Sequence, residues 1–368
     1  MFYQGDERSN VVKVRVRLLI VQCLGGPRMN IIATGGAGFI GSHFVRHMLT
    51  QHPDYHVIIL DLLTYAGNIH NLDDIIDHPN HTFVKGNITN RELVDWLIQT
   101  YHVDAIVNFA AESHVDRSIS DSRVFVTTNV QGTLVLLEAT RVNQLIKYVQ
   151  VSTDEVYGSL GETGYFTEMS PILPNSPYSA SKASADMLVR SYREAYGLNV
   201  NITRCSNNYG PYHFPEKLIP LMITNGLDGE QLPIYGDGQN IRDWLHVSDH
   251  CVAIDLVLHQ GKPGEVYNVG GHNERTNNDI VYFIVEQLNI SKERIVYVED
   301  RLGHDRRYAI DPTKIETELG WKPRYSLDQG ICETIDWYKR HEEWWRPLVK
   351  RAKLGNKKGY HWSEPRIY

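Results

Sequence analysis

The fold of this chain is decided by the stretch Asn30-Ile31-Ile32-Ala33-Thr34-Gly35-Gly36-Ala37-Gly38-Phe39-Ile40-Gly41. It starts with an apolar run that is typical of a buried parallel strand. The glycines that follow have the spacing G-x-x-G-x-x-G, with Gly35, Gly38 and Gly41 at the spaced positions. Apolar residues then recur every four positions, at Ile40, Phe44 and Met48, which predicts the buried face of a helix. The stretch therefore predicts a strand, a tight turn and a helix in this order.

Strand-like and helix-like segments alternate along most of the chain. Further strands are expected at His56–Leu60, Thr82–Val84, Ala105–Phe109, Tyr148–Val151 and Val266–Val269, and helices at Asn129–Val142, Val247–Leu258 and Ile331–Trp345. Strands separated by helices of this length predict a parallel sheet with right-handed crossovers. The expected fold is α/β, with a Rossmann-type doubly wound parallel sheet.

An acidic residue follows the glycine turn at the distance typical of a dinucleotide-binding unit. Asp61 ends the second predicted strand, 20 residues after Gly41. Its carboxylate can accept hydrogen bonds from ribose hydroxyls and repels a 2′-phosphate, for which Leu62 and Leu63 offer no arginine partner. Because a glycine turn also lets the backbone approach a pyrophosphate, the sequence predicts a bound NAD rather than NADP.

Composition and charge exclude several classes of protein. Of the 368 residues, 42% are apolar and 22% are charged, which is ordinary for a soluble globular protein. The formal net charge of −7, with dispersed Lys and Arg, argues against nucleic-acid binding. The four cysteines form no C-x-x-C pair and no metal-binding spacing, so we expect reduced thiols, a cytoplasmic location and no metal. No apolar run approaches the roughly 20 residues of a membrane span.

The stretch Thr153-Asp154-Glu155 carries the most chemical information. It follows the apolar run Tyr148–Val151, and in open α/β sheets ligands bind beyond the carboxyl ends of the strands. A hydroxyl and two adjacent carboxyl groups at that edge can bind a polar substrate and act as an acid/base pair. The alternative is a cluster of N-capping residues that only opens a helix.

Tyr178 and Lys182 form a second pair of candidate catalytic residues. They are four residues apart, so on a helix they share one face. The pKa of a free tyrosine is about 10, and a lysine cation one turn away, together with an oxidised nicotinamide, would stabilise the phenolate and lower that pKa. The alternative is an ordinary surface pair on a helix.

Together these motifs resemble the extended short-chain dehydrogenase/reductases that act on nucleotide sugars. Within that family, five stretches are similar to the 4,6-dehydratases: Asp61-Leu-Leu-Thr-Tyr-Ala-Gly-Asn68, Ala-Ala-Glu-Ser-His-Val-Asp-Arg117, Ser-Thr-Asp-Glu-Val-Tyr-Gly158, Arg-Cys-Ser-Asn-Asn-Tyr-Gly-Pro-Tyr-His-Phe-Pro-Glu-Lys217 and Asp300-Arg-Leu-Gly-His-Asp-Arg-Arg-Tyr308. The resemblance runs from about Met29 to Trp345. Its most specific part is the pair Asp154-Glu155, which epimerases and decarboxylases of the family usually lack.

The resemblance implies that the substrate is dTDP-glucose and the product dTDP-4-keto-6-deoxyglucose, on the route to deoxysugars such as rhamnose. Tyr178 would take the proton of the C4 hydroxyl while hydride passes to NAD, with Thr153 on the C4 oxygen and Lys182 on the nicotinamide ribose. Glu155 would remove the C5 proton and Asp154 would protonate the C6 hydroxyl, which leaves as water. Hydride returns to C6, so NAD ends oxidised and stays bound. This chemistry requires two carboxyl groups in different protonation states.

The resemblance also assigns residues to each ligand. Around NAD it places Phe39, Ile40, Asp61, Leu62, Leu63, Thr64, Asn87, Ile88, Phe109, Ala110, Ala111, Thr128 and Asn208, besides the turn glycines, Tyr178 and Lys182. Around the nucleotide sugar it places Ser113, Thr153, Asn207, Lys217, Leu218, Pro233, Tyr235, Arg242, Asn277, Arg301, His304 and Tyr308. Solvated surface charge is the alternative for the charged members of this second set. Asn87 departs from the family, which usually has an acid near the adenine amine, so we expect weaker contacts to adenine.

The expected domain organisation also follows from the resemblance. Residues 29–206 would form the NAD-binding domain, to which residues 243–270 return, and residues 207–345 would mainly form a smaller, interleaved nucleotide-sugar-binding domain. Residues 1–28 are expected to be an appended or upstream translated segment, with a signal peptide as the alternative. Residues 346–368 are expected to be a basic, mobile tail. Family members commonly form homodimers through helices that flank the sheet, and we expect one here.

Three other functions stay open at this point. The same reaction on UDP-glucose differs only by one methyl group of the base, which the sequence pattern does not resolve. An epimerase or a decarboxylase of the family would release no water. A catalytically silent nucleotide-sugar-binding protein is a third alternative, although such a protein needs none of the proton chemistry of Asp154, Glu155 and Tyr178.

Overall fold

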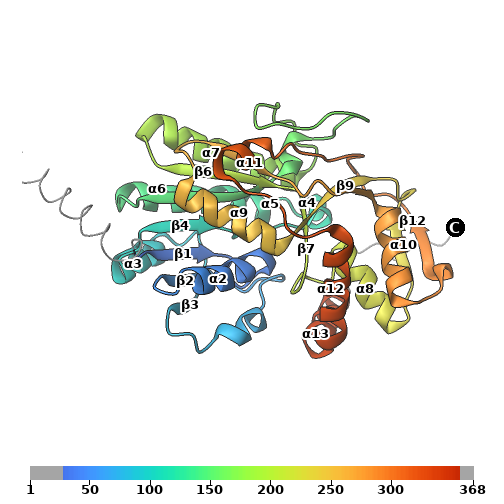
Figure 1. Ribbon diagram of the computed structural model, residues 1–368. Helices are drawn as coiled ribbons and strands as arrows, with labels where there is room; N and C mark the ends of the chain where they lie inside the picture. The colour runs from blue at the N-terminus through green and yellow to red at the C-terminus, as the bar shows by residue number, and fades with distance from the viewer. Residues whose placement is uncertain (1–27, 357–368) are drawn as a thin grey trace, which may run out of the picture.

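The computed structural model describes residues 28–356 and has a parallel sheet at its centre (Figure 1). Seven strands lie in the order β10-β6-β5-β4-β1-β2-β3, and every neighbouring pair is parallel. They are β1 (Asn30–Thr34), β2 (His56–Asp61), β3 (His81–Lys85), β4 (Ala105–Asn108), β5 (Lys147–Thr153), β6 (Val200–Cys205) and β10 (Val266–Val269). The α/β fold with a Rossmann-type doubly wound sheet is therefore confirmed, and each predicted strand of this sheet lies within two residues of its expected bounds.

Helices cover both faces of this sheet (Figure 1). One face carries α2 (Phe39–Gln51), α9 (Val247–Gln260) and α11 (Thr313–Leu319), and the other carries α3 (Arg91–Tyr101), α6 (Thr133–Val142) and α7 (Pro177–Tyr196). Phe44 and Met48 of α2 are completely buried against Ile254 of α9, which confirms the predicted apolar face of α2. Two hydrophobic cores, one on each face, therefore hold the strands in place.

A smaller part of the molecule lies beside the main sheet (Figure 1). It contains β7 (Asn207–Tyr209), α8 (Leu218–Asp228), β8 (Leu232–Tyr235), β9 (Ile241–His246), β11 (Glu274–Thr276), α10 (Asn277–Leu288), β12 (Ile295–Val298), α12 (Leu327–Arg340) and α13 (Glu342–Asn356). These elements share a third core, in which Met222, Ile284 and Ile335 are buried. The chain enters this part at β7 and returns to the main sheet with α9 and β10, so the two parts are interleaved. The domain boundaries given above stay a prediction.

Short helices complete the described chain. They are η1 (Ile69–Ile75), α4 (Val115–Ser120), α5 (Arg123–Phe125), η2 (Val126–Gly132), η3 (Asp154–Tyr157) and η4 (Lys292–Arg294). The helix predicted from Asn129 begins as the π-helical segment η2 and becomes an α-helix only at Thr133. Within residues 28–356, no helix has both the length and the apolar character that crossing a membrane requires.

Two predictions for the C-terminal region are wrong. The single helix expected at Ile331–Trp345 is divided at His341 into α12 and α13. The tail expected from residue 346 is helical as far as Asn356. The apolar side chains of Trp345 and Leu348 are buried in the third core and anchor α13 there. The many basic residues of this segment had suggested a solvent-exposed tail instead of a helix. Residues 357–368, and the N-terminal extension as far as residue 27, lie outside the described residues.

Helix α7 has a well-defined beginning. The Ser176 hydroxyl accepts a hydrogen bond from Ser179 N (3.1 Å), and the Ser179 hydroxyl accepts one from Ser176 N (3.0 Å), which together form a capping box. Pro177 occupies the first helical position, where its missing N–H costs nothing. The first two turns of α7 therefore hold Tyr178 and Lys182 at fixed positions, and both side chains are buried.

Replacing Ser176 by Ala is expected to lower the free energy of unfolding by about 1 kcal/mol, because the cap of α7 loses its acceptor. Urea denaturation of the purified variant would measure this loss. Ser191→Ala is a matched control, since Ser191 is exposed in the middle of the same helix, and we expect a change below about 0.5 kcal/mol. Equal losses in the two variants would contradict a specific role of the cap.

Candidate active site

The carboxyl ends of the central strands open onto a cavity of about 300 Å³. The turn after β1, the acid at the end of β2, the segment after β4 and the end of β5 all line it. Parallel strands bring these segments to one edge of the sheet although they are far apart in the sequence. Tyr178 and Lys182 of α7 line the same cavity.

The glycine turn after β1 leaves room for a phosphate group. Gly35 has a φ of +67°, and a Cβ there would lie 2.7 Å from Ala110 N, so no other residue fits. At Gly38, in contrast, a Cβ would have Gly35 O at 3.1 Å as its nearest neighbour, and this residue lines the cavity. The first turn of α2 contains no acidic residue and no side-chain cap, so its N–H groups remain available to an anion.

Asp61 lies at the end of β2 with a buried carboxylate. Its oxygens accept hydrogen bonds from Leu63 N (2.7 Å) and Ala37 N (3.0 Å), which fix the side chain at the rim of the glycine turn. Burial raises the pKa of Asp61, while the two backbone hydrogen bonds lower it. Each oxygen keeps a lone pair for a ribose hydroxyl, so the turn and Asp61 together fit a dinucleotide.

Nearly all residues assigned to NAD line this cavity. They are Gly35, Gly38, Phe39, Ile40, Gly41, Asp61, Leu62, Thr64, Asn87, Ile88, Phe109, Ala110, Ala111, Thr128, Tyr178, Lys182 and Asn208. Leu63 is the exception: it donates its backbone N–H to Asp61 and has a left-handed φ of 55°. The oxygen of the Asn87 amide already accepts from Thr89 N (3.0 Å), which leaves it one lone pair for an adenine amine.

The Thr153-Asp154-Glu155 stretch follows β5 directly and forms the start of the short helix η3. The Thr153 hydroxyl accepts from Glu155 N (3.3 Å), so the capping alternative is correct for Thr153. All three residues nevertheless line the cavity. Oδ2 of Asp154 is buried and has no hydrogen-bond partner among the described residues, which leaves this oxygen free for a ligand. Thr153 therefore caps η3, while Asp154 beside it offers an oxygen to a ligand in the cavity.

The two carboxyl groups have different electrostatic surroundings. Burial, followed by the charges of Glu155 and Asp243, raises the pKa of Asp154 well above its usual value. Burial also raises the pKa of Glu155, but the cations of Arg301, Lys217 and Arg242 oppose this. Burial thus raises the pKa of both carboxyl groups, and opposing cations act mainly on Glu155; the assignment of acid and base stays a prediction.

The electrostatics of Tyr178 are dominated by its burial. Burial, followed by the charge of Glu155, raises the pKa of Tyr178 well above 10, and a hydrogen bond with Thr153 lowers it. The Lys182 ammonium donates a hydrogen bond to Val151 O (2.7 Å). Lys182 is not among the groups that act most strongly on the pKa of Tyr178. The prediction concerned Lys182 together with an oxidised nicotinamide, so it stays a prediction, and the protein groups around Tyr178 raise its pKa.

The residues assigned to the nucleotide sugar divide into two groups. Ser113, Thr153, Asn207 and Lys217 line the cavity. The others lie outside its lining, at the start of α8 and α10, on β8 and β9, and in the segment after β12: Leu218, Pro233, Tyr235, Arg242, Asn277, Arg301, His304 and Tyr308. Lys217 donates a hydrogen bond to Ser113 O (3.0 Å), so two members of the first group contact each other.

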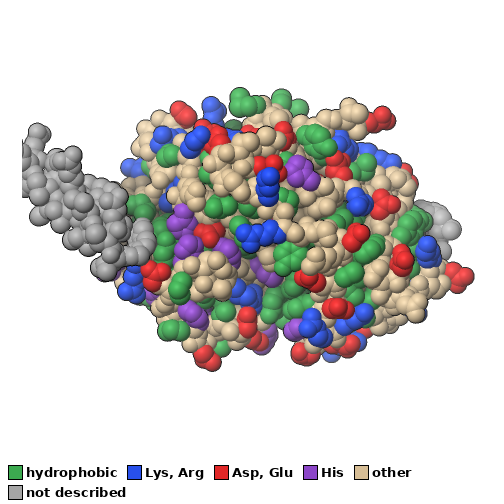
Figure 2. Space-filling view, viewed as in Figure 1, with side chains coloured by type: hydrophobic (Ala, Val, Ile, Leu, Met, Phe, Trp, Pro, Cys, Tyr) green, Lys and Arg blue, Asp and Glu red, His purple; other side chains and the backbone are tan. Residues whose placement is uncertain are grey.

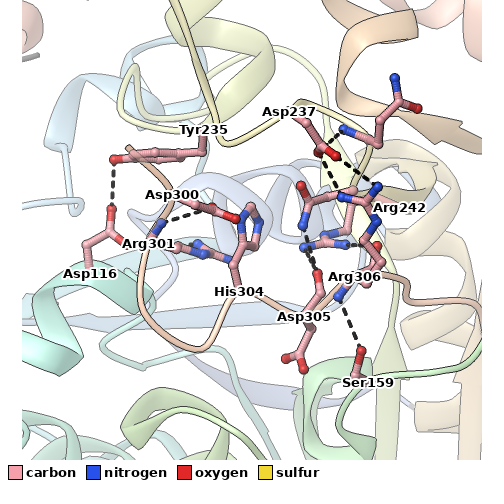
Figure 3. A network of polar contacts seen from close by, with 12 residues as sticks. Asp116, Ser159, Tyr235, Asp237, Arg242, Asp300, Arg301, His304, Asp305 and Arg306 are labelled. Atoms are coloured by element: carbon pink, nitrogen blue, oxygen red, sulfur yellow. Dashed lines mark hydrogen bonds and ion pairs between the residues drawn. The ribbon is translucent and has the colours of Figure 1, made fainter. Parts of the chain in front are cut away.

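Figure 3 shows the polar contacts around four members of the second group, Tyr235, Arg242, Arg301 and His304. The Arg301 guanidinium lies 4.0 Å from the Asp116 carboxylate, which also accepts from the Tyr235 hydroxyl (3.3 Å). Arg242 is buried and donates to the carbonyl oxygens of Ile241 (2.7 Å) and Asp305 (2.8 Å). These arginines are therefore not solvated surface charges, and both act on the pKa of Glu155.

Sequence reasoning missed several residues of the cavity. They are Leu60, Ala66, Gly67, Gly86, Glu112, Val151, Ser152, Cys205, Ser206, His213, Phe214 and Glu216. Ser152, Ser206 and Glu216 directly precede assigned residues, so their neighbours could have indicated them. His213 stacks on Phe39 with ring centroids 4.2 Å apart, a contact across 174 positions that no local pattern reveals.

Comparisons with known proteins agree with this site. Residues 32–334 match the profile of one protein family, described as GDP-mannose 4,6 dehydratase. The chain belongs to the GDP-mannose 4,6 dehydratase family. One similar protein is the dTDP-glucose 4,6-dehydratase of Xanthomonas campestris pv. campestris (strain B100). It is 53% identical to this chain over 331 residues, which are 85% of this chain and 94% of the relative.

Two solved structures of dTDP-glucose 4,6-dehydratases are also similar to this chain. The dTDP-glucose 4,6-dehydratase of Bacillus anthracis str. Ames in complex with NAD is 57% identical, with a TM-score of 0.82 over 87% of this chain and 99% of that one. The enzyme of Streptomyces venezuelae with NAD and TYD bound is 51% identical, with a TM-score of 0.85 over 87% and 100%. The resemblance found in the sequence is thereby confirmed.

Asp154→Asn is expected to raise the free energy of unfolding at about pH 8 by about 1 kcal/mol or more, because each unit by which folding raises the pKa of a carboxyl group costs roughly 1.4 kcal/mol at high pH. Because the folded protein raises the pKa of Asp154, wild-type stability falls as the pH rises above the unfolded-state pKa of roughly 3.9. Asparagine does not titrate, so the variant escapes this loss. Urea denaturation over a range of pH would measure the difference between the two proteins.

The advantage of the Asp154 variant should shrink as the pH falls toward about 4, where the wild-type carboxyl is protonated in both states. Asp121→Asn is the control, since Asp121 is exposed and paired with Arg123, and we expect no gain from it. A stability advantage of Asp154→Asn that is independent of pH would show that Asp154 is not held in a charge-disfavouring site.

Proposed function

We propose that this chain is a dTDP-glucose 4,6-dehydratase, a hydro-lyase that converts dTDP-glucose to dTDP-4-keto-6-deoxyglucose and water. The observation that carries the proposal is the cavity in which Asp154, Glu155 and Tyr178 lie together, with cations that oppose the rise in pKa mainly at Glu155. An epimerase needs no such pair. Relatives more than 50% identical bear this enzyme's name, which supports the same conclusion.

NAD is the cofactor of the proposed reaction, tightly bound and regenerated in each turnover. The residues that would hold it are the glycine turn, Asp61 and Lys182, with the apolar side chains of Phe39 and Ile88 beside them. The chemistry that it supplies when bound is reversible acceptance of a hydride. Two structures of similar enzymes were solved with NAD, which supports this choice.

The first proton transfer belongs to Tyr178 and Thr153. The two side chains are close enough to share a hydrogen bond that favours the phenolate, so a substrate hydroxyl at C4 can reach both. Tyr178 takes the proton of that hydroxyl and Thr153 holds the oxygen. Lys182, fixed by Val151 O, keeps its ammonium at the floor of the cavity, where it binds the nicotinamide ribose.

Elimination of water belongs to the carboxyl pair. Once C4 is a ketone, the C5 proton is acidic, and the ionised Glu155 removes it. Asp154 gives its proton to the C6 hydroxyl, which leaves as water; its unpartnered Oδ2 is the atom from which the proton departs. Glu155 afterwards returns a proton to C5, so both carboxyl groups end in the states in which they began.

The cations on the substrate side suit a nucleoside diphosphate. Nε of Arg301 is buried without a hydrogen-bond partner among the described residues, and Arg242 and Lys217 are near enough to act on Glu155. Planar guanidinium groups bind diphosphate oxygens well. Tyr235, His304, Asn207, Asn277 and Tyr308 complete this side, and a uridine in place of the thymidine would meet the same groups.

Two features support the proposed homodimer and its compartment. Exposed apolar side chains lie on or beside helices that flank the sheet, namely Val124, Val126, Leu134, Val142, Met187 and Tyr196. A second copy of the chain would cover such a surface. Cys205, Cys251 and Cys332 are free thiols, which suits the reducing cytoplasm.

Mass spectrometry of the product made from dTDP-glucose deuterated at C4 tests the function. We expect loss of one water and recovery of the deuterium at C6, because hydride is returned within one active site. UDP-glucose in a parallel reaction measures the preference for the base. Conversion without loss of mass would identify an epimerase, and no conversion of either sugar would leave a binding protein.

Glu155→Gln is expected to lower turnover by about 10²- to 10⁴-fold, because the C5 proton loses its base. Oxidation at C4 does not use Glu155, so absorbance of the reduced nicotinamide should still appear after mixing with substrate. Tyr178→Phe should lose that absorbance as well, since it removes the first proton acceptor. Glu162→Gln, a change of an exposed glutamate, should leave turnover as in the wild type. Wild-type turnover by Glu155→Gln would refute its role.

A further inference from the structure

Histidines from two helices surround one carboxylate on the face of the molecule that carries α2 and α9. Figure 2 shows histidine side chains gathered on this face. The Asp255 carboxylate lies 2.7 Å from Nε2 of His47, 3.0 Å from Nε2 of His52 and 2.8 Å from Nδ1 of His259. His47 is on α2, His52 ends it, and Asp255 and His259 are on the last turns of α9.

We propose that His52, Asp255 and His259 bind one divalent transition-metal ion. One ligand atom from each residue, two imidazole nitrogens and a carboxylate oxygen, lies within 4.8 Å of the others. Ligand atoms about 2.1 Å from a tetrahedral ion are about 3.4 Å apart. The distances of 3.0 Å and 2.8 Å from the carboxylate to the two nitrogens need to lengthen by only about 0.5 Å to reach this arrangement.

The spacing of the ligands along the chain suits such a site. Asp255 and His259 are four residues apart on α9, so they project from one face, as paired metal ligands on a helix do. His52 approaches from the end of α2, and α2 packs against α9. The side chains of His52, Asp255 and His259 are 15–26% exposed, so an ion can reach the cluster from solvent.

Two further residues orient the proposed ligands. His47 contacts the second carboxylate oxygen of Asp255, and the Tyr55 hydroxyl lies 2.9 Å from Nε2 of His259. When Nδ1 of a histidine binds a metal, its other nitrogen normally donates a hydrogen bond that fixes the ring. Tyr55 is in place as that acceptor, and the rings of His52 and Tyr55 stack with centroids 4.6 Å apart. His47 and Tyr55 thus hold Asp255 and His259 in place for the ion.

The donor set identifies the class of ion. Two imidazoles and one carboxylate suit Zn²⁺, Co²⁺ or Ni²⁺, whereas Mg²⁺ and Ca²⁺ prefer oxygen ligands alone. The site is distant from catalysis, because α2 and α9 end at the edge of the sheet opposite to Asp154 and Tyr178. A bound ion would therefore join the two helices and stabilise the fold without entering the reaction.

Isothermal titration of the full-length, NAD-loaded enzyme with ZnCl₂, after removal of metals with a chelator, tests the site. We expect saturable binding of one Zn²⁺ per chain. Zinc at about 100 times its dissociation constant should raise the melting temperature by about 5 °C. Co²⁺ in place of Zn²⁺ should give the visible absorbance of a low-coordinate cobalt site.

Variants decide where the ion binds. His52→Ala and Asp255→Asn should each lose the saturable binding and the rise in melting temperature, while turnover stays as in the wild type. His272→Ala removes a histidine–carboxylate pair elsewhere, between His272 and Glu316, and should change neither. Absence of saturable binding by the wild type, or equal binding by His52→Ala, would overturn the proposal, since the cluster would then be a hydrogen-bonded junction only.

Discussion

The close approach of backbone to backbone at Gly35 is the constraint on which the site depends. Gly35 N donates to Leu60 O of β2 (2.8 Å), and its Cα faces Ala110 beyond the end of β4, so one residue joins three strands. This contact brings the turn, Asp61 and the segment after β4 to one edge of the sheet. Since β5 pairs with β4, the Thr153-Asp154-Glu155 stretch is delivered to the same edge. The cofactor surface and the acid/base groups are thus positioned by the same sheet.

The proposed catalytic groups are held in surroundings that disfavour their charged forms. Asp154 and Tyr178 are buried and Glu155 is half-buried beside them; the charge of Glu155 raises the pKa of both Asp154 and Tyr178, and the charge of Asp154 raises that of Tyr178. Folding must desolvate all three, so the active site lowers the stability of the fold in exchange for defined protonation states. The hydrophobic cores on both faces of the sheet and the capped helix α7 offset this cost. The two carboxyl groups differ in the cations that act on them, since Arg242 acts on the pKa of both but Arg301 and Lys217 act on that of Glu155.

Much of the fold, and many of the residues that line the cavity, could be predicted because their signals are local. Apolar runs located the strands, and the spacing of Tyr178 and Lys182 placed them on one helix face. What depends on distant contacts could not be predicted. The engagement of Lys182 by Val151 O, the pairing of Arg301 with Asp116 and the burial of Trp345 all require the folded chain. The same holds for the histidines around Asp255, which come from segments about 200 positions apart.

The two ligands of this enzyme are enclosed by parts of the structure with different attachments. The wall around NAD consists of strand ends and the start of two long helices, which belong to the main sheet. The wall proposed for the sugar diphosphate includes the segment from Asp300 to Tyr308, which follows the two-stranded β8–β12 sheet and is held by side chains such as Asp116. Displacing this segment opens the sugar side and leaves the dinucleotide side intact. In the proposed reaction, the sugar can then exchange in every cycle while the cofactor remains bound for many cycles.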